Sequence, residues 1–164
     1  MIKIFDGNEE HIPTIAQIAD KTWHHTYAEI LSAEQLNYML ATIYDTATLT
    51  SAMRNGTQQF LLLKDNHGFQ GFISFGTRPE DPHIFKIHKL YVLPENQGKG
   101  YGKILIDEVK KRMRARGIKK LDLNVNRFNP AQHFYRKLGF RVLREEDIPI
   151  GPFWMNDYVM RLEI

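Results

Sequence analysis

The sequence predicts an α/β fold in which one mixed sheet carries helices on its faces. Short apolar runs that alternate like strands are interleaved with longer helical patterns along the chain. A glycine-rich loop, Gln97 to Lys103, follows one strand-like run and opens a long amphipathic helix pattern. With 164 residues, 43% of them hydrophobic, the chain has enough apolar surface for one core. We therefore expect a single domain over residues 1–164.

The N-terminal third has the pattern of one strand and three helices. Residues 2–5 alternate like a short strand, and Asn8 can cap a helix that runs through Lys21. Ser32 begins a candidate capping box for a second helix, whose apolar residues continue at helical spacing as far as Ile43. A third, short helix is expected over residues 46–54.

The middle of the chain predicts a hairpin, a strand, the glycine-rich loop and a long helix. Residues 58–64 and 69–76 are strand-like and flank the turn sequence Asn66-His67-Gly68. The strand expected over residues 83–92 leads into the loop. The helix expected over residues 104–116 repeats apolar residues every four positions.

The C-terminal part predicts three more strands and one helix. Residues 120–126 place three apolar side chains on one face. The helix begins at Asn129 or Pro130 and ends at Gly139. Strands over residues 140–143 and 157–162 complete the sheet.

The loop Gln97-Gly98-Lys99-Gly100-Tyr101-Gly102-Lys103 indicates a site for a phosphorylated ligand. A loop that opens a helix leaves N–H groups unpaired at the positive end of the helix dipole. Its glycines let the backbone approach an anion, and its lysines add positive charge. The spacing fits neither common nucleotide loop, since a Walker loop needs Ser or Thr where Ile104 stands and the dinucleotide fingerprint needs G-x-G-x-x-G.

Two motifs carry a resemblance to a known family. The loop contains Q-x-x-G-x-G at Gln97, Gly100 and Gly102, after a strand that ends Leu90-Tyr91-Val92. A second block follows in the expected order, with matches at Ala131, Phe134, Tyr135, Lys137, Gly139 and Phe140. Together these blocks resemble the GNAT superfamily of acetyl-CoA-dependent N-acetyltransferases.

The second block departs from the family pattern at one position. Phe128 stands three residues before Ala131, where the motif usually has asparagine. Asn126 and Asn129 flank that place, so which asparagine meets the cofactor stays open.

The resemblance implies a mostly antiparallel sheet that splays at Leu90-Tyr91-Val92 and admits the pantetheine arm of acetyl-CoA. It implies direct attack by the acceptor amine on the thioester in a ternary complex, with a backbone N–H holding the thioester oxygen. The cofactor-binding residues that it implies are Leu90, Tyr91, Val92, Gln97, Gly98, Lys99, Gly100, Tyr101, Gly102, Lys103, Asn126, Asn129 and Lys137.

Tyr135 matches the general acid of the family, which protonates the leaving thiolate. The ordinary pKa of a tyrosine hydroxyl is near 10, so the group carries its proton at neutral pH. The alternative is that Phe134 and Tyr135 are only core aromatics at the end of a helix.

His88 is the candidate general base that must take a proton from the acceptor amine. On the strand before the loop, the two-residue period predicts that Lys86, His88 and Leu90 share one face. His88 lies two residues before Leu90, where related arylalkylamine acetyltransferases carry a catalytic histidine. Lys86 stands where histone-type acetyltransferases carry a glutamate, which argues against their mechanism. Glu29, His25 and a water relay remain alternatives.

The acceptor pocket is expected between the first helices and the last strands, as the resemblance implies. The candidate acceptor-binding residues are Trp23, Tyr27, Glu29, Trp154 and Asp157. Aromatic walls suit an alkyl amine or an amino-acid side chain, and the two carboxylates could attract a cation. The alternative is that these aromatics form core or the seam of a homodimer. The layout also resembles bacterial polyamine (spermidine-type) acetyltransferases.

Composition excludes several classes of site. The chain has no cysteine, which excludes disulfides, thiolate zinc sites and a cysteine nucleophile. Its seven histidines have no metal-ligand spacing, so no metal is expected. A net charge of +3 is too small to argue for nucleic-acid binding. No apolar run could cross a membrane and the first residues are not a signal peptide, so we expect a cytoplasmic protein.

The leading functional prediction is an enzyme that transfers acetyl from acetyl-CoA to a primary amine of a small molecule or a protein. An acyltransferase that uses a larger acyl-CoA is one alternative. A catalytically silent acyl-CoA-binding sensor or interaction module is another, which the presence of Tyr135 disfavours.

Overall fold

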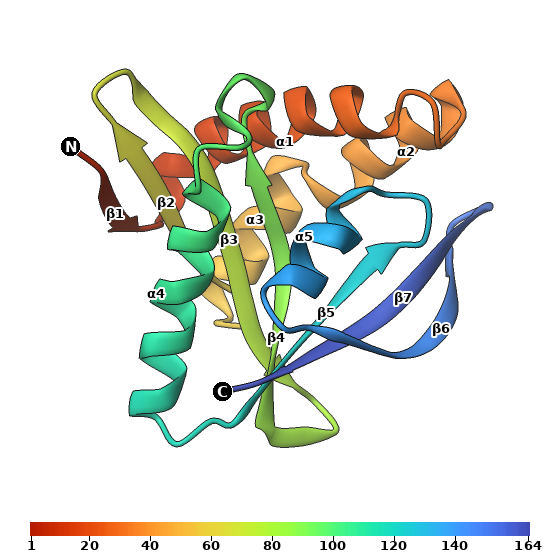
Figure 1. The fold of residues 1–164 in the computed structure, drawn as a ribbon. Helices are drawn as coiled ribbons and strands as arrows, with labels where there is room; N and C mark the ends of the chain where they lie inside the picture. The colour runs from red at the N-terminus through yellow and green to blue at the C-terminus, as the bar shows by residue number, and fades with distance from the viewer.

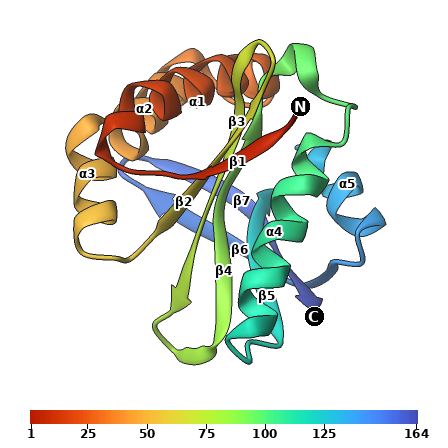
Figure 2. The same cartoon turned by 90° about the vertical axis from the view of Figure 1, so that its left-hand side faces the viewer.

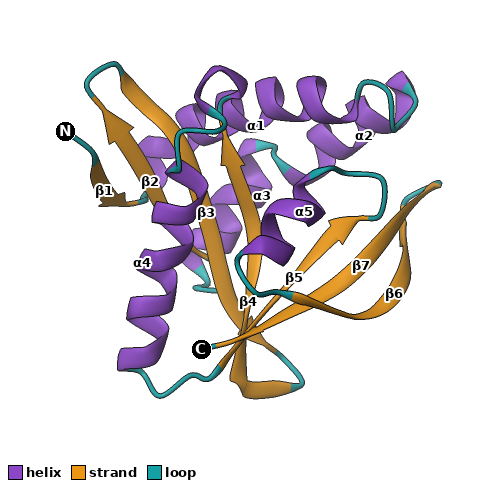
Figure 3. Ribbon diagram, viewed as in Figure 1, coloured by secondary structure: helices purple, strands orange, loops and turns teal.

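A computed structural model describes residues 1–164 as one seven-stranded sheet with helices on both faces (Figures 1 and 3). The strand order is β1-β2-β3-β4-β5-β7-β6, and every neighbouring pair is antiparallel except β4 and β5. The predicted mixed, mostly antiparallel sheet is therefore confirmed. The strands are β1 (Lys3–Asp6), β2 (Gln59–Asp65), β3 (Gly68–Arg78), β4 (Asp81–Val92), β5 (Lys120–Asn126), β6 (Arg141–Ile150) and β7 (Phe153–Glu163).

The helices form two groups, one on each side of the sheet (Figure 2). Two apolar clusters fill the spaces between the sheet and these helices, one under α1–α3 and one under α4 and α5. The helices are α1 (Ile12–Tyr27), α2 (Ala33–Ile43), α3 (Thr46–Arg54), α4 (Tyr101–Ala115) and α5 (Ala131–Lys137), with short 3₁₀ turns η1 (Glu9–His11) and η2 (Pro94–Asn96).

Helix α1 is longer than predicted and begins later. Asn8 caps only the turn η1, where its Oδ1 accepts from the Glu10 N–H at 2.9 Å. The helix then continues to Tyr27, not to Lys21, because Thr22, Trp23 and Tyr27 extend its buried face. The Trp23 to Tyr27 segment is therefore helical.

The last two strands are also longer than predicted and form a long hairpin. They meet at a turn in which Gly151 has φ of 57°. Alternating exposure along β6 leaves several charged residues on its outer face, so its apolar pattern is weak. Sequence periodicity therefore marked only residues 140–143 and 157–162.

A β-bulge in β4 separates this strand from β5. Phe75 of β3 pairs with Ile87 and Ser74 pairs with Lys89, so His88 is the extra residue. Strand β5 pairs with β4 only at residues 84–87 of β4. From there to Asn126, β5 is paired only with β7. The two strands diverge beyond the bulge (Figure 1), which confirms the predicted splay at Leu90-Tyr91-Val92.

The same bulge overturns the prediction that Lys86, His88 and Leu90 share one face. Ile87 packs in the α4 cluster, and so does Leu90, three residues later. The His88 ring lies on the other face, next to Gly76: a Cβ built on that glycine would be 3.4 Å from His88 Nε2. Leu90, in contrast, packs on the α4 side. The extra residue shifts the two-residue alternation by one.

Candidate functional site

A cavity of about 700 Å³ lies where β4 and β5 part. Its walls come from the end of α1, from β4 and β5, from the glycine-rich loop and from α5. The predicted site residues that line it are Tyr27, His88, Leu90, Tyr91, Val92, Gln97, Gly98, Gly100, Tyr101, Gly102, Lys103, Asn129 and Tyr135.

The glycine-rich loop presents free backbone donors to this cavity. Gly98 and Gly100 have φ of 88° and 85°, a left-handed conformation that favours glycine. The N–H groups of Gly98, Gly100 and residues 101–103 have no acceptor within the chain. Since α4 begins at Tyr101, these donors sit at the positive end of its dipole and can bind an anion.

Side chains on both sides hold the loop in place. The Tyr101 hydroxyl donates to Asp65 Oδ2 at 2.8 Å, and Lys99 Nζ donates to Asn96 Oδ1 at 2.9 Å. A Cβ on Gly102 would lie 3.2 Å from the Phe134 ring, so α4 and α5 approach closely at this glycine. Lys103 is paired with Asp107 at 2.7 Å. These contacts hold the loop in its conformation.

The β4 edge that faces the cavity carries backbone groups that are not paired with another strand. Leu93 N donates to Gln70 O at 2.8 Å, and bonding alternates along an antiparallel ladder. By this alternation, Leu90 and Val92 turn their N–H and C=O groups away from β3. Gln97 Nε2 donates to the Val92 carbonyl at 3.1 Å, which agrees with that direction.

Tyr135 reaches the cavity from α5 with its hydroxyl free of hydrogen-bond partners in the chain. Its ring is buried between Phe134 and Phe140, at centroid distances of 5.4 and 5.7 Å. Burial raises the pKa of the Tyr135 hydroxyl well above its ordinary value, and the nearby Tyr91 adds to the effect. The Tyr135 hydroxyl therefore carries its proton at neutral pH.

The structure treats the two candidate asparagines differently. Asn129 lines the cavity, and its Nδ2 donates to the Tyr27 hydroxyl at 3.2 Å. Asn126 is buried outside the lining, where its Oδ1 accepts from the Phe128 N–H at 2.9 Å. Lys137 is exposed at the end of α5 and does not line the cavity.

His88 opens onto the cavity among positive charges. Loss of water around the ring, followed by the charges of Lys86 and Lys89, lowers the pKa of His88 from 6.5 to about 3. The ring is therefore neutral at physiological pH. Lys89 itself is buried, donates to Gln58 Oε1 at 2.9 Å, and has a pKa lowered to about 8, chiefly by burial.

The five residues predicted to bind the acceptor do not gather at one place. Tyr27 lines the cavity, whereas Trp23 is buried behind it, 4.6 Å from the Tyr27 ring between centroids. Glu29 is exposed in the turn after α1, and Trp154 is 57% exposed near the start of β7. Asp157 is buried in β7 and accepts a hydrogen bond from Asn124, which does line the cavity.

Sequence reasoning missed several polar residues of the cavity wall, among them Lys89 and Asn124. Asn124 lies on β5 among alternating apolar residues, and that alternation could have marked its face as polar. Lys89 could not be found this way, because the bulge that turns it inward has no sequence pattern of its own. The chain contains no group of three or more His, Cys, Asp or Glu side chains able to hold a metal ion, and none of its helices is long and apolar enough to span a membrane.

Comparison with known proteins identifies a matching family and several sequence relatives. The model of the acetyltransferase (GNAT) family matches residues 13–140. A spermidine N(1)-acetyltransferase of Thermoplasma acidophilum is 29% identical over 135 residues, or 81% of this chain and 84% of that protein. A ribosomal protein bS18-alanine N-acetyltransferase of Haemophilus influenzae is 32% identical over 52% of this chain and 58% of that protein.

A solved structure matches the whole fold. The PaiA N-acetyltransferase of Thermoplasma acidophilum, in complex with coenzyme A, has a TM-score of 0.84 and 28% identity. The match covers 100% of this chain and 99% of that one.

Proposed function

Because this chain belongs to the GNAT family of acetyltransferases, we propose that it transfers the acetyl group of acetyl-CoA to a primary amine. The observation that carries this proposal is one cavity shared by three features. These are the free donors of the loop, the open edge of β4 and the unpartnered hydroxyl of Tyr135. The coenzyme A bound to the Thermoplasma structure supports the choice of acyl donor.

The three features correspond to three parts of acetyl-CoA. The N–H groups of the loop bind the pyrophosphate, and Asn129 is the asparagine that faces the bound thioester arm. Leu90 and Val92 pair with the pantetheine amides, and a backbone N–H of this edge donates to the thioester oxygen. Tyr135 lies on the α5 side of the same cavity.

The reaction then needs two proton movements. The amine nitrogen attacks the thioester carbon, a C–N bond forms, and the C–S bond breaks. Tyr135 gives its proton to the leaving thiolate, and its raised pKa keeps it protonated until then. The amine attacks in its neutral form, and after the C–N bond forms its nitrogen loses one proton, which returns to Tyr135 through water and restores the general acid.

The lowered pKa of His88 favours transfer of the amine proton to water over its uptake by His88. An alkyl ammonium has a pKa near 10.4, and burial together with the neighbouring lysines lowers the pKa of His88, so His88 is a weak acceptor for the proton of an ammonium. His88 therefore serves as a neutral hydrogen-bond acceptor that directs the amine, and water in the cavity carries the proton away. Glu29 and His25 are alternative routes for the same proton, and His25 lines the cavity.

The acceptor is a primary amine of a polyamine or of a protein. The names of the relatives, which specify spermidine and an alanine of a ribosomal protein, support both kinds of amine. We also propose a cytoplasmic location, where acetyl-CoA and such amines meet, and the homodimer stays a prediction.

A panel of acyl-CoAs followed by an amine screen tests this function. We expect acetyl-CoA to raise the unfolding temperature of the protein and a primary amine to trigger release of free thiol. A larger acyl-CoA that both binds better and reacts faster would assign the enzyme a different acyl donor. Binding without thiol release from any amine would favour the sensor.

A further inference from the structure

A chain of side-chain hydrogen bonds connects the β2–β3 turn to the glycine-rich loop. Asp65, the last residue of β2, accepts from the Tyr101 hydroxyl through Oδ2 at 2.8 Å and from Gln70 Nε2 through Oδ1 at 3.1 Å. Gln70 Oε1 accepts from Asn96 Nδ2, and Asn96 Oδ1 accepts from Lys99 Nζ at 2.9 Å. In Figures 1 and 2 the turn lies beside the segment that leads from β4 into α4.

The chain is attached to the loop at two places, one on each side of its left-handed glycines. Asn96 ends the turn η2 before them, and Tyr101 begins α4 after them. Gly98 and Gly100 lie between, and glycine is the residue with the widest choice of backbone conformations. Fixing both sides of this segment therefore fixes the direction of the free N–H groups within it.

The middle of the chain is buried. Gln70 and Asn96 are 7% and 6% exposed, so a polar group that lost its partner here would stay without water. The backbone of Gln70 is held as well, because its carbonyl accepts from the Leu93 N–H at 2.8 Å. A buried network in which each group has its partner favours one geometry.

Asp65 stands where the chain divides into two arms, one to Tyr101 and one through Gln70 to Asn96. Its Oδ1 also accepts from the His67 N–H at 2.8 Å, which closes the turn. This hydrogen bond, with smaller contributions from Tyr101 and Gln70, lowers the pKa of Asp65. The carboxylate is therefore ionised at neutral pH, and its hydrogen bonds are of the stronger, charge-assisted kind.

We propose that Asp65 is a positioning residue for the acyl donor, which holds the glycine-rich loop in the conformation that binds the pyrophosphate of acetyl-CoA. It lies 36 positions before Tyr101 in the chain. Like Gln70, it does not line the cavity, so it acts through the loop and not by touching the cofactor. This inference rests on the proposed use of acetyl-CoA and adds a residue outside the cavity that sets its affinity.

Two acetyl donors that differ in the pyrophosphate test this role, acetyl-CoA and acetyl-pantetheine, each with an amine that the wild type accepts. We expect Asp65→Ala to raise KM for acetyl-CoA at least about tenfold, or about 1.4 kcal/mol, with kcat within about twofold of the wild type. The same variant should change kcat/KM for acetyl-pantetheine less than about twofold. Calorimetry with coenzyme A should show the same loss of affinity in the absence of any amine.

Three further variants separate the hydrogen bonds from general damage. Gln70→Leu cuts one arm from outside the cavity and should weaken coenzyme A binding at least about threefold, which carries the test if Asp65→Ala does not fold. Asp65→Asn can bond the same three partners and should bind coenzyme A within about twofold of the wild type. His67→Ala, at an exposed position that keeps its N–H, should bind it like the wild type.

The outcomes distinguish this role from the proposed function. Unchanged affinity for coenzyme A in Asp65→Ala, or equal losses with both acetyl donors, would overturn the positioning role alone. An Asp65→Asn variant that binds as weakly as Asp65→Ala would overturn it as well. A wild type that binds no coenzyme A would overturn the proposed function and this inference with it.

Discussion

Tyr135 is the residue on which the proposed chemistry depends most directly. Its ring is fixed by two aromatic neighbours, and its hydroxyl is the part left free toward the cavity. Such a group adds little to cofactor binding but can supply the proton that the thiolate needs.

We expect Tyr135→Phe to keep its affinity for acetyl-CoA and to lose roughly 10²–10⁴-fold in turnover, the usual contribution of a positioned acid. Tyr158→Phe is the matched control, since it alters a tyrosine of the same apolar cluster outside the cavity lining. Steady-state kinetics at saturating acetyl-CoA measure the effect. Near-normal turnover of Tyr135→Phe would assign the proton to water.

His88 leads to a second prediction, for the dependence of rate on pH. Because its pKa is lowered to about 3, the ring is neutral from about pH 5 upward, and we expect no loss of activity from protonation of His88 near pH 6.5. We expect His88→Gln to lower kcat/KM while the shape of the profile between pH 5 and 9 stays that of the wild type.

The same experiment can contradict this reading of His88. An acidic limb near pH 6.5 in the wild type that disappears in His88→Gln would show that His88 titrates as an ordinary general base. Acetyl-CoA affinity, measured by calorimetry on both proteins, controls for damage to the cofactor site.

At this scale the sequence predicted residues that belong to short local motifs. The loop glycines and Tyr135 lie in the cavity because their spacing alone places them at the ends of α4 and α5. The prediction that His88 and Leu90 lie on the same face of β4 was wrong, because one extra residue in β4 shifts the alternation of side chains. Asn124 and Asp157 are 33 positions apart in the chain, and only the pairing of β5 with β7 brings them together.

Among the elements, the start of α4 is the part most clearly built for an anion. We expect Gly100→Asp to weaken acetyl-CoA binding by more than about tenfold, because a carboxylate would face the pyrophosphate. Gly56→Asp is the control, since Gly56 has a similar left-handed φ of 72°, compared with 85° for Gly100, and no atom near its Cβ position. Calorimetry should show weak binding only for Gly100→Asp, and equal affinities for both variants would refute the anion site.

The elements differ in how far the sequence could predict them. Helix α3 and strand β5 were predicted to the residue, since turn residues bound the first and a clear alternation marks the second. Helix α1 was cut short at Lys21, because its last turns are aromatic and become helical through packing in the core. The hairpin β6–β7 was shortened because its charged outer face hides the strand period.

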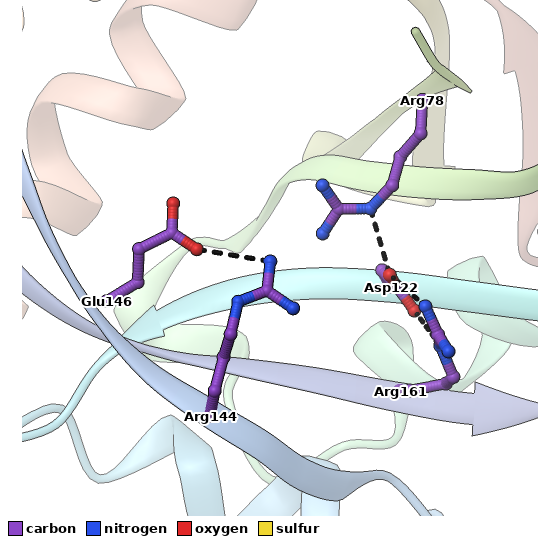
Figure 4. Close-up of polar contacts among 5 residues, drawn as sticks. All are labelled: Arg78, Asp122, Arg144, Glu146 and Arg161. Atoms are coloured by element: carbon purple, nitrogen blue, oxygen red, sulfur yellow. Dashed lines mark hydrogen bonds and ion pairs between the residues drawn. The ribbon is translucent and has the colours of Figure 1, made fainter. Parts of the chain in front are cut away.

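At the scale of the whole molecule, a buried ionic cluster joins three strands of the sheet (Figure 4). Asp122 of β5 accepts from Arg78 of β3 at 2.9 Å and from Arg161 of β7 at 2.7 and 3.0 Å. The carboxylate is 1% exposed and the two arginines are mostly buried. The cluster lies in the part of the sheet where β4 and β5 are still paired, and its ion pairs connect β5 and β7 to β3.

We expect Asp122→Ala to lower the free energy of unfolding by about 3–5 kcal/mol, because it leaves two guanidinium groups without their counter-ion. Glu163→Ala breaks an exposed pair with Arg141 and should cost less than about 1 kcal/mol. Urea unfolding of both variants provides the comparison. A loss of similar, small size in the two would show that the cluster does not hold the strands together.

The central claim is that one cavity brings acetyl-CoA and a primary amine together for direct transfer. The measurement that tests it most directly is the initial rate of thiol release over a matrix of acetyl-CoA and amine concentrations, with the acetylated amine quantified by mass spectrometry. We predict rates that require both substrates, intersecting double-reciprocal lines, and one acetylated amine for each thiol released. Parallel lines, or thiol release that does not depend on the amine, would contradict direct transfer in this cavity.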